Sequence, residues 1–116
     1  MPDKLKEEFG DYFEYKKYYS FRRYPFFGIR EKYNVWHSLN QNIKIEPKSN
    51  QPYLLTVHDV NFIEEVSNNP QHPRNLRFQE KLNRSSAITY ISEYAKRSTH
   101  QYFKVPDIPE FVIYNG

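Results

Sequence analysis

The sequence has no cysteine and very little glycine, and each absence excludes a class of site. Without cysteine, the chain cannot form disulfides, hold a metal through thiolates or use a cysteine nucleophile. Glycine occurs only at Gly10, Gly28 and Gly116, whereas glycine-rich phosphate-binding loops need several glycines close together. The chain therefore carries no self-contained dinucleotide site and no P-loop.

Long apolar runs and a strong charge imbalance are also lacking. The N-terminus has no apolar stretch typical of a signal peptide, and no segment approaches the ~20 apolar residues of a membrane span. We therefore expect a soluble or peripheral protein. The net charge of +3 is too small to indicate nucleic acid as a partner, and 116 residues give room for one domain, residues 1–116.

Aromatic residues are abundant, at 18% of the chain, and many stand in the first third. Residues 4–24 lack proline and follow a candidate cap at Asp3, and their aromatic residues recur at spacings of three and four, so we predict a helix that ends before Pro25. The segment "YFEYKKYYSFRRYPFFGIREK", residues 12–32, mixes these aromatics with basic side chains, among them Lys16, Lys17, Arg22 and Arg23. One interpretation is an amphipathic helix that packs its tyrosines on a sheet. The other is contact with an anionic membrane surface, or stacking on nucleic acid.

Beyond residue 32, short apolar runs alternate with helical patterns. The predicted strands are residues 33–41, 53–59, 87–92 and 111–115, and the predicted helices are residues 74–84 and 93–103. Leu76, Phe78 and Leu82 are the expected apolar positions of the first of these helices. The run "YLLTVHD" shows no polar alternation, which is typical of a parallel sheet covered on both faces. The pattern predicts an α/β fold with a Rossmann-like, doubly wound parallel sheet flanked by helices.

Polar residues follow each predicted strand, where ligands of open parallel sheets bind. They are His37 and Ser38, His58 and Asp59, Ser92 and Glu93, and finally Asn115 and Gly116. Any strand leaves a core through polar residues, but four strands delivering such groups to one edge favour a ligand site. His58 is the strongest candidate of the set.

Two chemical alternatives are weaker. His37, His58 and Asp59 could supply ligands to a metal, but they lack a characteristic spacing, so we expect none. Ser92, His58 and Asp59 could form a hydrolytic triad. However, consecutive residues of a strand point to opposite faces, and "ISEYA" lacks the G-x-S-x-G turn that exposes a nucleophilic serine.

Four segments in order resemble the N-terminal domain of the family 4, or group 1, retaining glycosyltransferases, which have the GT-B fold. The segments are "YNVWHSLNQ", "YLLTVHDVNFIEE", "KLNRSSAITYISEYAKRSTHQYF" and "FVIYNG", and together they span residues 33–116. The resemblance implies a partial, acceptor-side Rossmann-like domain of an enzyme that transfers a sugar from a nucleotide-sugar to a glycan or lipid-linked acceptor. It also implies that His58 contacts the donor sugar and that Ser92 and Glu93 begin a helix at the same cleft.

The resemblance carries further expectations. No cofactor or metal is implied beyond the nucleotide-sugar as co-substrate, and the setting would be cytoplasmic, peripheral on the inner face of the cell membrane, in polysaccharide or lipopolysaccharide biosynthesis. His37, Asp59 and Asn115 would support substrate binding, with Asp59 fixing either its loop or the imidazole. The family's first strand and its C-terminal donor-binding domain have no counterpart here, so we expect no activity from this chain alone and expect self-association of a partial sheet. The rival hypothesis is a non-catalytic basic-aromatic module that binds anionic membrane or RNA.

Overall fold

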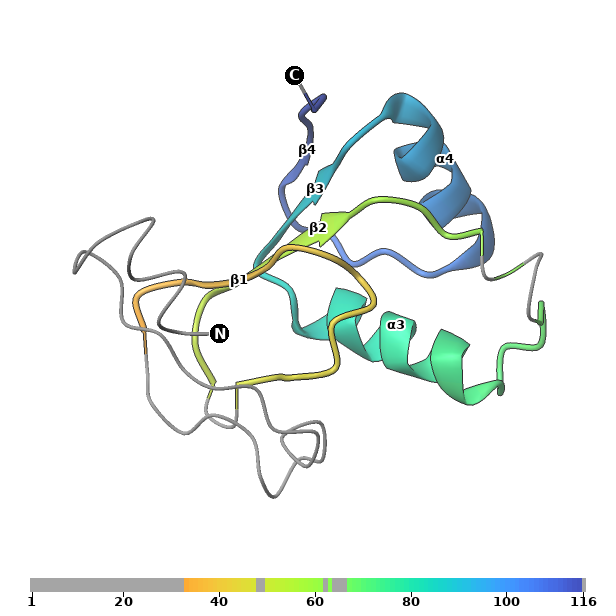
Figure 1. Ribbon diagram of the computed structural model, residues 1–116, viewed down its shortest axis with the longest axis horizontal. Coiled ribbons are helices and arrows are strands. Elements are labelled where there is room, and N and C mark those ends of the chain that lie inside the picture. The colour runs from red at the N-terminus through yellow and green to blue at the C-terminus, as the bar shows by residue number, and fades with distance from the viewer. Residues whose placement is uncertain (1–32, 48–49, 62, 64–66, 116) are drawn as a thin grey trace, which may run out of the picture.

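The computed structural model describes residues 33–47, 50–61, 63 and 67–115, which form a small α/β fold (Figure 1). The elements in order are β1 (Trp36–Ser38), β2 (Tyr53–Val57), α3 (Pro73–Arg84), β3 (Ala87–Tyr90), α4 (Glu93–Tyr102) and β4 (Glu110–Val112). The predicted helix over residues 4–24 lies outside the described residues. Neither described helix is long and apolar enough to cross a membrane.

The four strands form one parallel sheet, as the sequence predicts. Each strand pairs with the next one along the chain, giving the order β1-β2-β3-β4. The prediction of a doubly wound sheet is wrong for the described strands, because their order never reverses. A reversal needs a strand that returns to the other side of the first one, and each described connection instead steps in the same direction.

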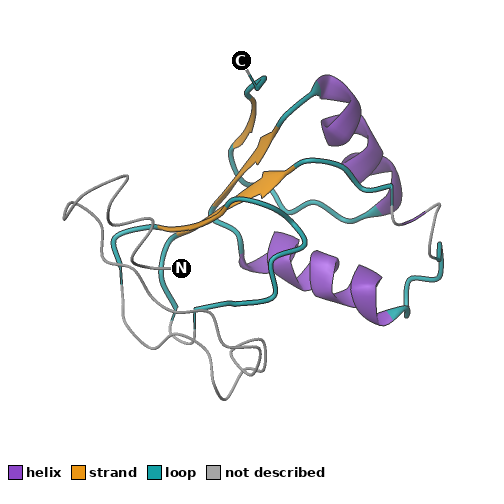
Figure 2. Ribbon diagram, viewed as in Figure 1, coloured by secondary structure: helices purple, strands orange, loops and turns teal. Residues whose placement is uncertain are grey.

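The two faces of the sheet differ in cover. In β2, Tyr53, Leu55 and Val57 are buried, whereas Leu54 and Thr56 between them are only half-buried. Figures 1 and 2 show α3 and α4 on the same side of the sheet, as expected when two right-handed crossovers step in one direction. The described residues therefore cover one face, here called the helix face. They leave the other, the open face, without the second helical layer that the continuous apolar run predicts.

The hydrophobic core lies between the helix face and the two helices. It is one cluster, and its buried members are Tyr53, Leu55, Val57, Val60, Ile63, Phe78, Leu82, Ile88, Tyr90 and Ala95. The ring of Phe103, just after α4, contacts the Phe78 ring edge-on with centroids 4.6 Å apart. This packing fixes both helices against the sheet and so fixes the loops that precede them.

Helix α3 begins at a proline and buries two of its three predicted apolar positions. Pro73 occupies the first turn, where a missing N–H costs nothing, and the His72 ring caps the helix by accepting from the Arg74 amide. Phe78 and Leu82 are buried as predicted, but Leu76 is 47% exposed. Two residues correspond to ~200° of helical rotation, so Leu76 and Phe78 cannot share a face.

Candidate functional site

The carboxyl edge of the sheet brings three of the predicted site residues to one end of the molecule. Val57, Tyr90 and Val112 stand side by side in the register of β2, β3 and β4. His58, Ser92 and Asn115 follow these three positions within a few residues. The predicted convergence at one edge is therefore present for these strands.

Gln41, which the sequence analysis did not select, organises the loop at this edge. Its Oε1 accepts from the backbone N–H of His58 at 2.9 Å, and its Nε2 donates to the backbone carbonyl of Asp59 at 2.8 Å. The side chain is 4% exposed. Ser38 of β1 is paired with Leu55 of β2 in the register. Gln41 follows Ser38 at the same spacing as His58 follows Leu55, so the two residues leave their strands at the same level. Only the strand register could have identified it.

The imidazole of His58 is held by the loop that follows β1. Its Nε2 lies 2.9 Å from the backbone carbonyl oxygen of Leu39. Because a carbonyl only accepts, Nε2 must carry the proton and donate. In the neutral ring, Nδ1 is then the acceptor, and no partner for it is found among the described residues. His58 can thus accept a hydrogen bond from a hydroxyl of a bound molecule.

Asp59 supports the loop, one of the two roles expected for it. Its Oδ1 accepts from the backbone N–H of Asn61 at 3.2 Å, which closes a short turn after β2. Within the described residues it makes no hydrogen bond to the His58 ring. Asp59 therefore shapes the chain that leaves the strand.

Ser92 is the N-cap of α4, as predicted. Its backbone is extended, and its Oγ accepts from the Ala95 N–H at 3.1 Å. Glu93 is exposed in the first turn, where a carboxylate interacts favourably with the helix dipole. Asn115 is exposed beyond β4. The cap directs the N-terminus of α4, and the partial positive charge it carries, towards the carboxyl edge.

His37 lies elsewhere, which corrects its predicted place after a strand. Strand β1 extends to Ser38, so His37 is inside it, on the open face. Its Nε2 shares a hydrogen bond with Thr56 Oγ1 at 2.8 Å, and Thr56 shares another with Thr89 Oγ1 at 2.8 Å. His37 and His58 are therefore separated along the sheet. The described residues contain no group of three or more side chains able to hold a metal.

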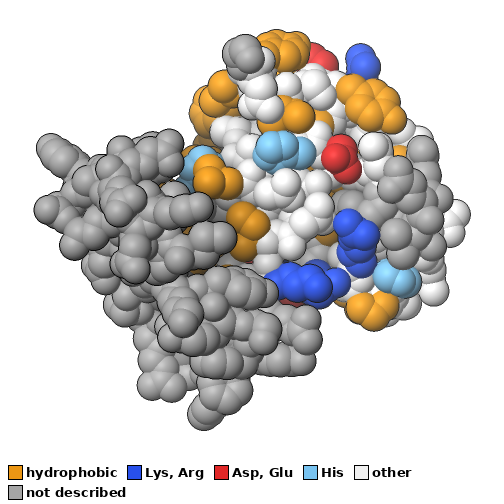
Figure 3. Space-filling view, in the orientation of Figure 1, with side chains coloured by type: hydrophobic (Ala, Val, Ile, Leu, Met, Phe, Trp, Pro, Cys, Tyr) orange, Lys and Arg blue, Asp and Glu red, His pale blue; other side chains and the backbone are white. Residues whose placement is uncertain are grey.

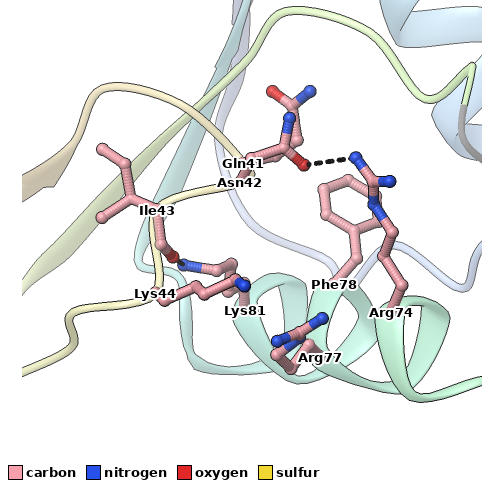
Figure 4. Close-up of a pocket in the computed structure, with 8 residues that line it drawn as sticks. All are labelled: Gln41, Asn42, Ile43, Lys44, Arg74, Arg77, Phe78 and Lys81. Atoms are coloured by element: carbon pink, nitrogen blue, oxygen red, sulfur yellow. Dashed lines mark hydrogen bonds between the residues drawn. The ribbon is translucent and has the colours of Figure 1, made fainter. Parts of the chain in front are cut away.

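A pocket beside the carboxyl edge was not predicted. It has a volume of about 250 Å³ and lies between the loop after β1 and helix α3. Its lining residues are Gln41, Asn42, Ile43, Lys44, Arg74, Arg77, Phe78 and Lys81 (Figure 4). The space-filling view shows Lys and Arg side chains gathered over α3 (Figure 3). Arg74, Arg77 and Lys81 lie at helical spacing within α3, but only the fold brings Lys44 and the loop after β1 to face them.

Glu46 anchors one wall of this pocket from behind. Its carboxylate pairs with Lys81 and Arg84 and accepts a hydrogen bond of 2.8 Å from the Tyr53 hydroxyl. The Arg84 guanidinium also lies 5.1 Å from the centre of the Tyr53 ring. Burial of Tyr53 and the neighbouring Glu46 charge raise the pKa of that hydroxyl above its usual range. This network holds the loop of residues 43–47 against α3.

The predicted membrane-contact residues cannot be placed in this geometry. Lys16, Lys17, Arg22 and Arg23 lie outside the described residues. The membrane and RNA hypotheses therefore stay predictions from the sequence.

Comparisons of the chain with protein-family models, with curated proteins and with solved structures give no match. The proposed function therefore rests on the geometry of the carboxyl edge.

Proposed function

We propose that this chain is the acceptor-side part of a glycosyltransferase, which binds a sugar-containing ligand at the carboxyl edge of its sheet. The observation that carries the proposal is the pairing of a fixed imidazole with a capped helix N-terminus at one edge. His58 is held through Nε2 and keeps Nδ1 as an acceptor, and Ser92 orients the first turn of α4. A sugar offers hydroxyl groups to the first and phosphate or ring oxygens to the second.

In this function the described residues position substrate. His58 accepts from a sugar hydroxyl, the backbone N–H groups at the start of α4 donate to an oxygen of the ligand, and Gln41 keeps the two loops of the edge in register. Holding reactants in place lowers the barrier by removing rotational and translational freedom before reaction. A donor-binding domain would supply the nucleotide-sugar across the cleft.

Binding of nucleotide-sugars to the isotopically labelled chain tests the proposal. We expect amide shifts to change at His58 and at the start of α4 when the matching sugar nucleotide or its acceptor is added. The substitution His58→Ala should weaken that binding about two- to tenfold, the effect of losing a hydrogen bond between uncharged groups, worth about 0.5–1.5 kcal/mol. Amide resonances, read by NMR, report the place of binding directly.

His37→Ala is the matched control, because His37 is an exposed histidine of the same sheet that lies on the open face. It should leave binding unchanged. Equal binding by the His58→Ala variant and the unmodified chain would contradict the assigned role. Shift changes confined to the opposite edge of the sheet would contradict the proposed site.

A further inference from the structure

The basic pocket is built from two segments that are distant in the sequence. The loop of residues 41–44 forms one wall, and α3 contributes Arg74, Arg77, Phe78 and Lys81 on successive turns of one side. Figure 4 shows the side chains of the two segments facing each other across the pocket. Its volume of about 250 Å³ is just below the roughly 300 Å³ at which pockets for drug-sized ligands begin, so a small ligand fits best.

The pocket carries positive charge only. Four of its lining residues are basic and none is acidic. The Lys81 ammonium, whose side chain is 7% exposed, is paired with Glu46, which lies outside the lining set. Lys44 and Arg77 are exposed and form no ion pair within the described part of the chain. The positive charges of Lys44 and Arg77 are therefore not paired with any acidic side chain of the described residues.

Hydrogen-bonding groups stand beside these charges. Arg74 donates to Asn42 Oδ1 at 3.2 Å, which links α3 to the loop after β1 across the pocket (Figure 4). The buried ring of Phe78 lies between the two walls. Guanidinium groups match the geometry of phosphate oxygens, and ammonium groups add point charge. Such a set suits an anion with several oxygens better than a single carboxylate.

We propose that this pocket binds a phosphate-bearing ligand of the pyrophosphate type. Lys44 and Arg77 contact its oxygens directly, and Arg74, hydrogen-bonded to Asn42, holds the two walls together. Gln41 lines the pocket and also holds the backbone of His58 and Asp59, so the pocket adjoins the carboxyl edge. This site goes beyond the proposed sugar transfer, because it rests on the charges of the pocket and would exist whatever ligand the edge binds.

Thermal unfolding with sodium pyrophosphate tests the site, with sodium chloride at equal ionic strength as the reference. We expect Tm to rise by about 4–8 °C at ten times the Kd. Replacing Lys44→Gln and Arg77→Gln together should lower the affinity at least about tenfold, since charge-assisted hydrogen bonds are lost. Both side chains are exposed, so the variant should keep the fold, which circular dichroism checks.

The matched control is Arg97→Gln with Lys104→Gln, which removes the same charge from exposed positions outside the pocket. It should bind pyrophosphate like the unmodified chain. Equal loss of binding in both variants would show a general charge effect and overturn the site. No rise in Tm over sodium chloride would overturn it as well.

The phosphate could belong to a lipid headgroup or to a soluble ligand, and sedimentation with vesicles separates the two sources. Retention on phosphatidic acid vesicles that pyrophosphate displaces and that the Lys44→Gln, Arg77→Gln variant loses assigns a lipid headgroup. Binding of pyrophosphate without retention on the vesicles assigns a soluble ligand. Failure to bind either probe overturns the proposal and leaves the His58 test at the sheet edge unaffected.

Discussion

At the scale of single residues, the carboxyl edge depends most on Gln41, whose amide side chain is neither an acid, a base nor a nucleophile. Position after a strand was enough to select His58 and Ser92 from the sequence, because parallel strands end at a common edge. Gln41 has no such signal, since its role arises only when β1 is paired with β2. His37 was misplaced for the related reason that the end of a short strand cannot be read to within one residue.

Gln41→Ala should destabilise the chain by about 1–3 kcal/mol, because it leaves buried backbone groups of His58 and Asp59 without their partners. Urea unfolding followed by circular dichroism measures the change. Gln101→Ala, at an exposed position of α4, serves as the control and should stay within about 0.5 kcal/mol. A Gln41 variant as stable as the control would show that the two hydrogen bonds contribute nothing net.

At the scale of elements, the caps and breaks of the sequence located the helices well. Ser92 and Pro73 mark the starts of α4 and α3 within one residue of the predicted positions, because caps act through local backbone geometry. The buried side of α3 was harder to predict. Leu76 is apolar yet exposed, whereas Asn75 and Lys81 are buried on the inner side. Asn75 Nδ2 donates to the backbone carbonyls of Ser67 and Asn69, and Lys81 pairs with Glu46.

A polar contact ties β3, α4 and β4 together. The Tyr90 hydroxyl and His100 Nε2 both donate to Glu110 Oε1 at 2.6 Å. Burial acts to raise the pKa of Glu110, but the hydrogen bonds from Tyr90 and His100 and the charges of His100 and Lys96 hold it below its usual range. Burial and the same carboxylate raise the pKa of the Tyr90 hydroxyl.

This contact predicts how stability depends on acid. A carboxyl whose pKa is lowered in the folded state stabilises the protein above its unfolded pKa, here 4.5, and that stability is lost as the pH falls through the folded value. We expect Glu110→Gln to show a smaller loss of unfolding free energy than the unmodified chain between about pH 6 and about pH 3. Urea titrations at several pH values measure it.

Glu80→Gln provides the comparison for this experiment. Glu80 is an exposed carboxylate of α3 that forms no ion pair within the described residues, so its replacement should leave the acid dependence unchanged. Parallel pH profiles for Glu110→Gln and the unmodified chain would contradict the assigned role of Glu110.

At the scale of the whole molecule, composition and periodicity predicted the α/β class and the parallel sheet but not the order of its strands. Apolar runs such as Tyr53–Val57 show that a strand is buried, and its neighbours are decided by how the crossovers pack. The same limit explains the basic pocket, which needs Lys44 and Arg77 to meet across two segments.

The open face and the last strand predict self-association. Phe111, in the edge strand β4, is 53% exposed, and Ile113, directly after that strand, is 60% exposed. Ile113→Lys should reduce the increase of sedimentation coefficient with protein concentration, because a charge at a strand edge opposes pairing. Leu76→Lys, on the exposed side of α3, should not change it. Identical concentration dependence in the Ile113 variant and the unmodified chain would rule out association through this edge.

The strand order also sets the sequence of events in folding. Each strand pairs with the one made just before it, so a growing chain always finds the partner of its newest strand already synthesised. The separations are unequal, because Trp36 faces Tyr53, Leu54 faces Ala87, and Ile88 faces Glu110. Joining β2 to β3 closes the longest stretch of chain and carries the greatest entropy cost. Formation of α3 and its packing on β2 shorten that stretch, so they should lower the entropy cost of joining β3 to β2.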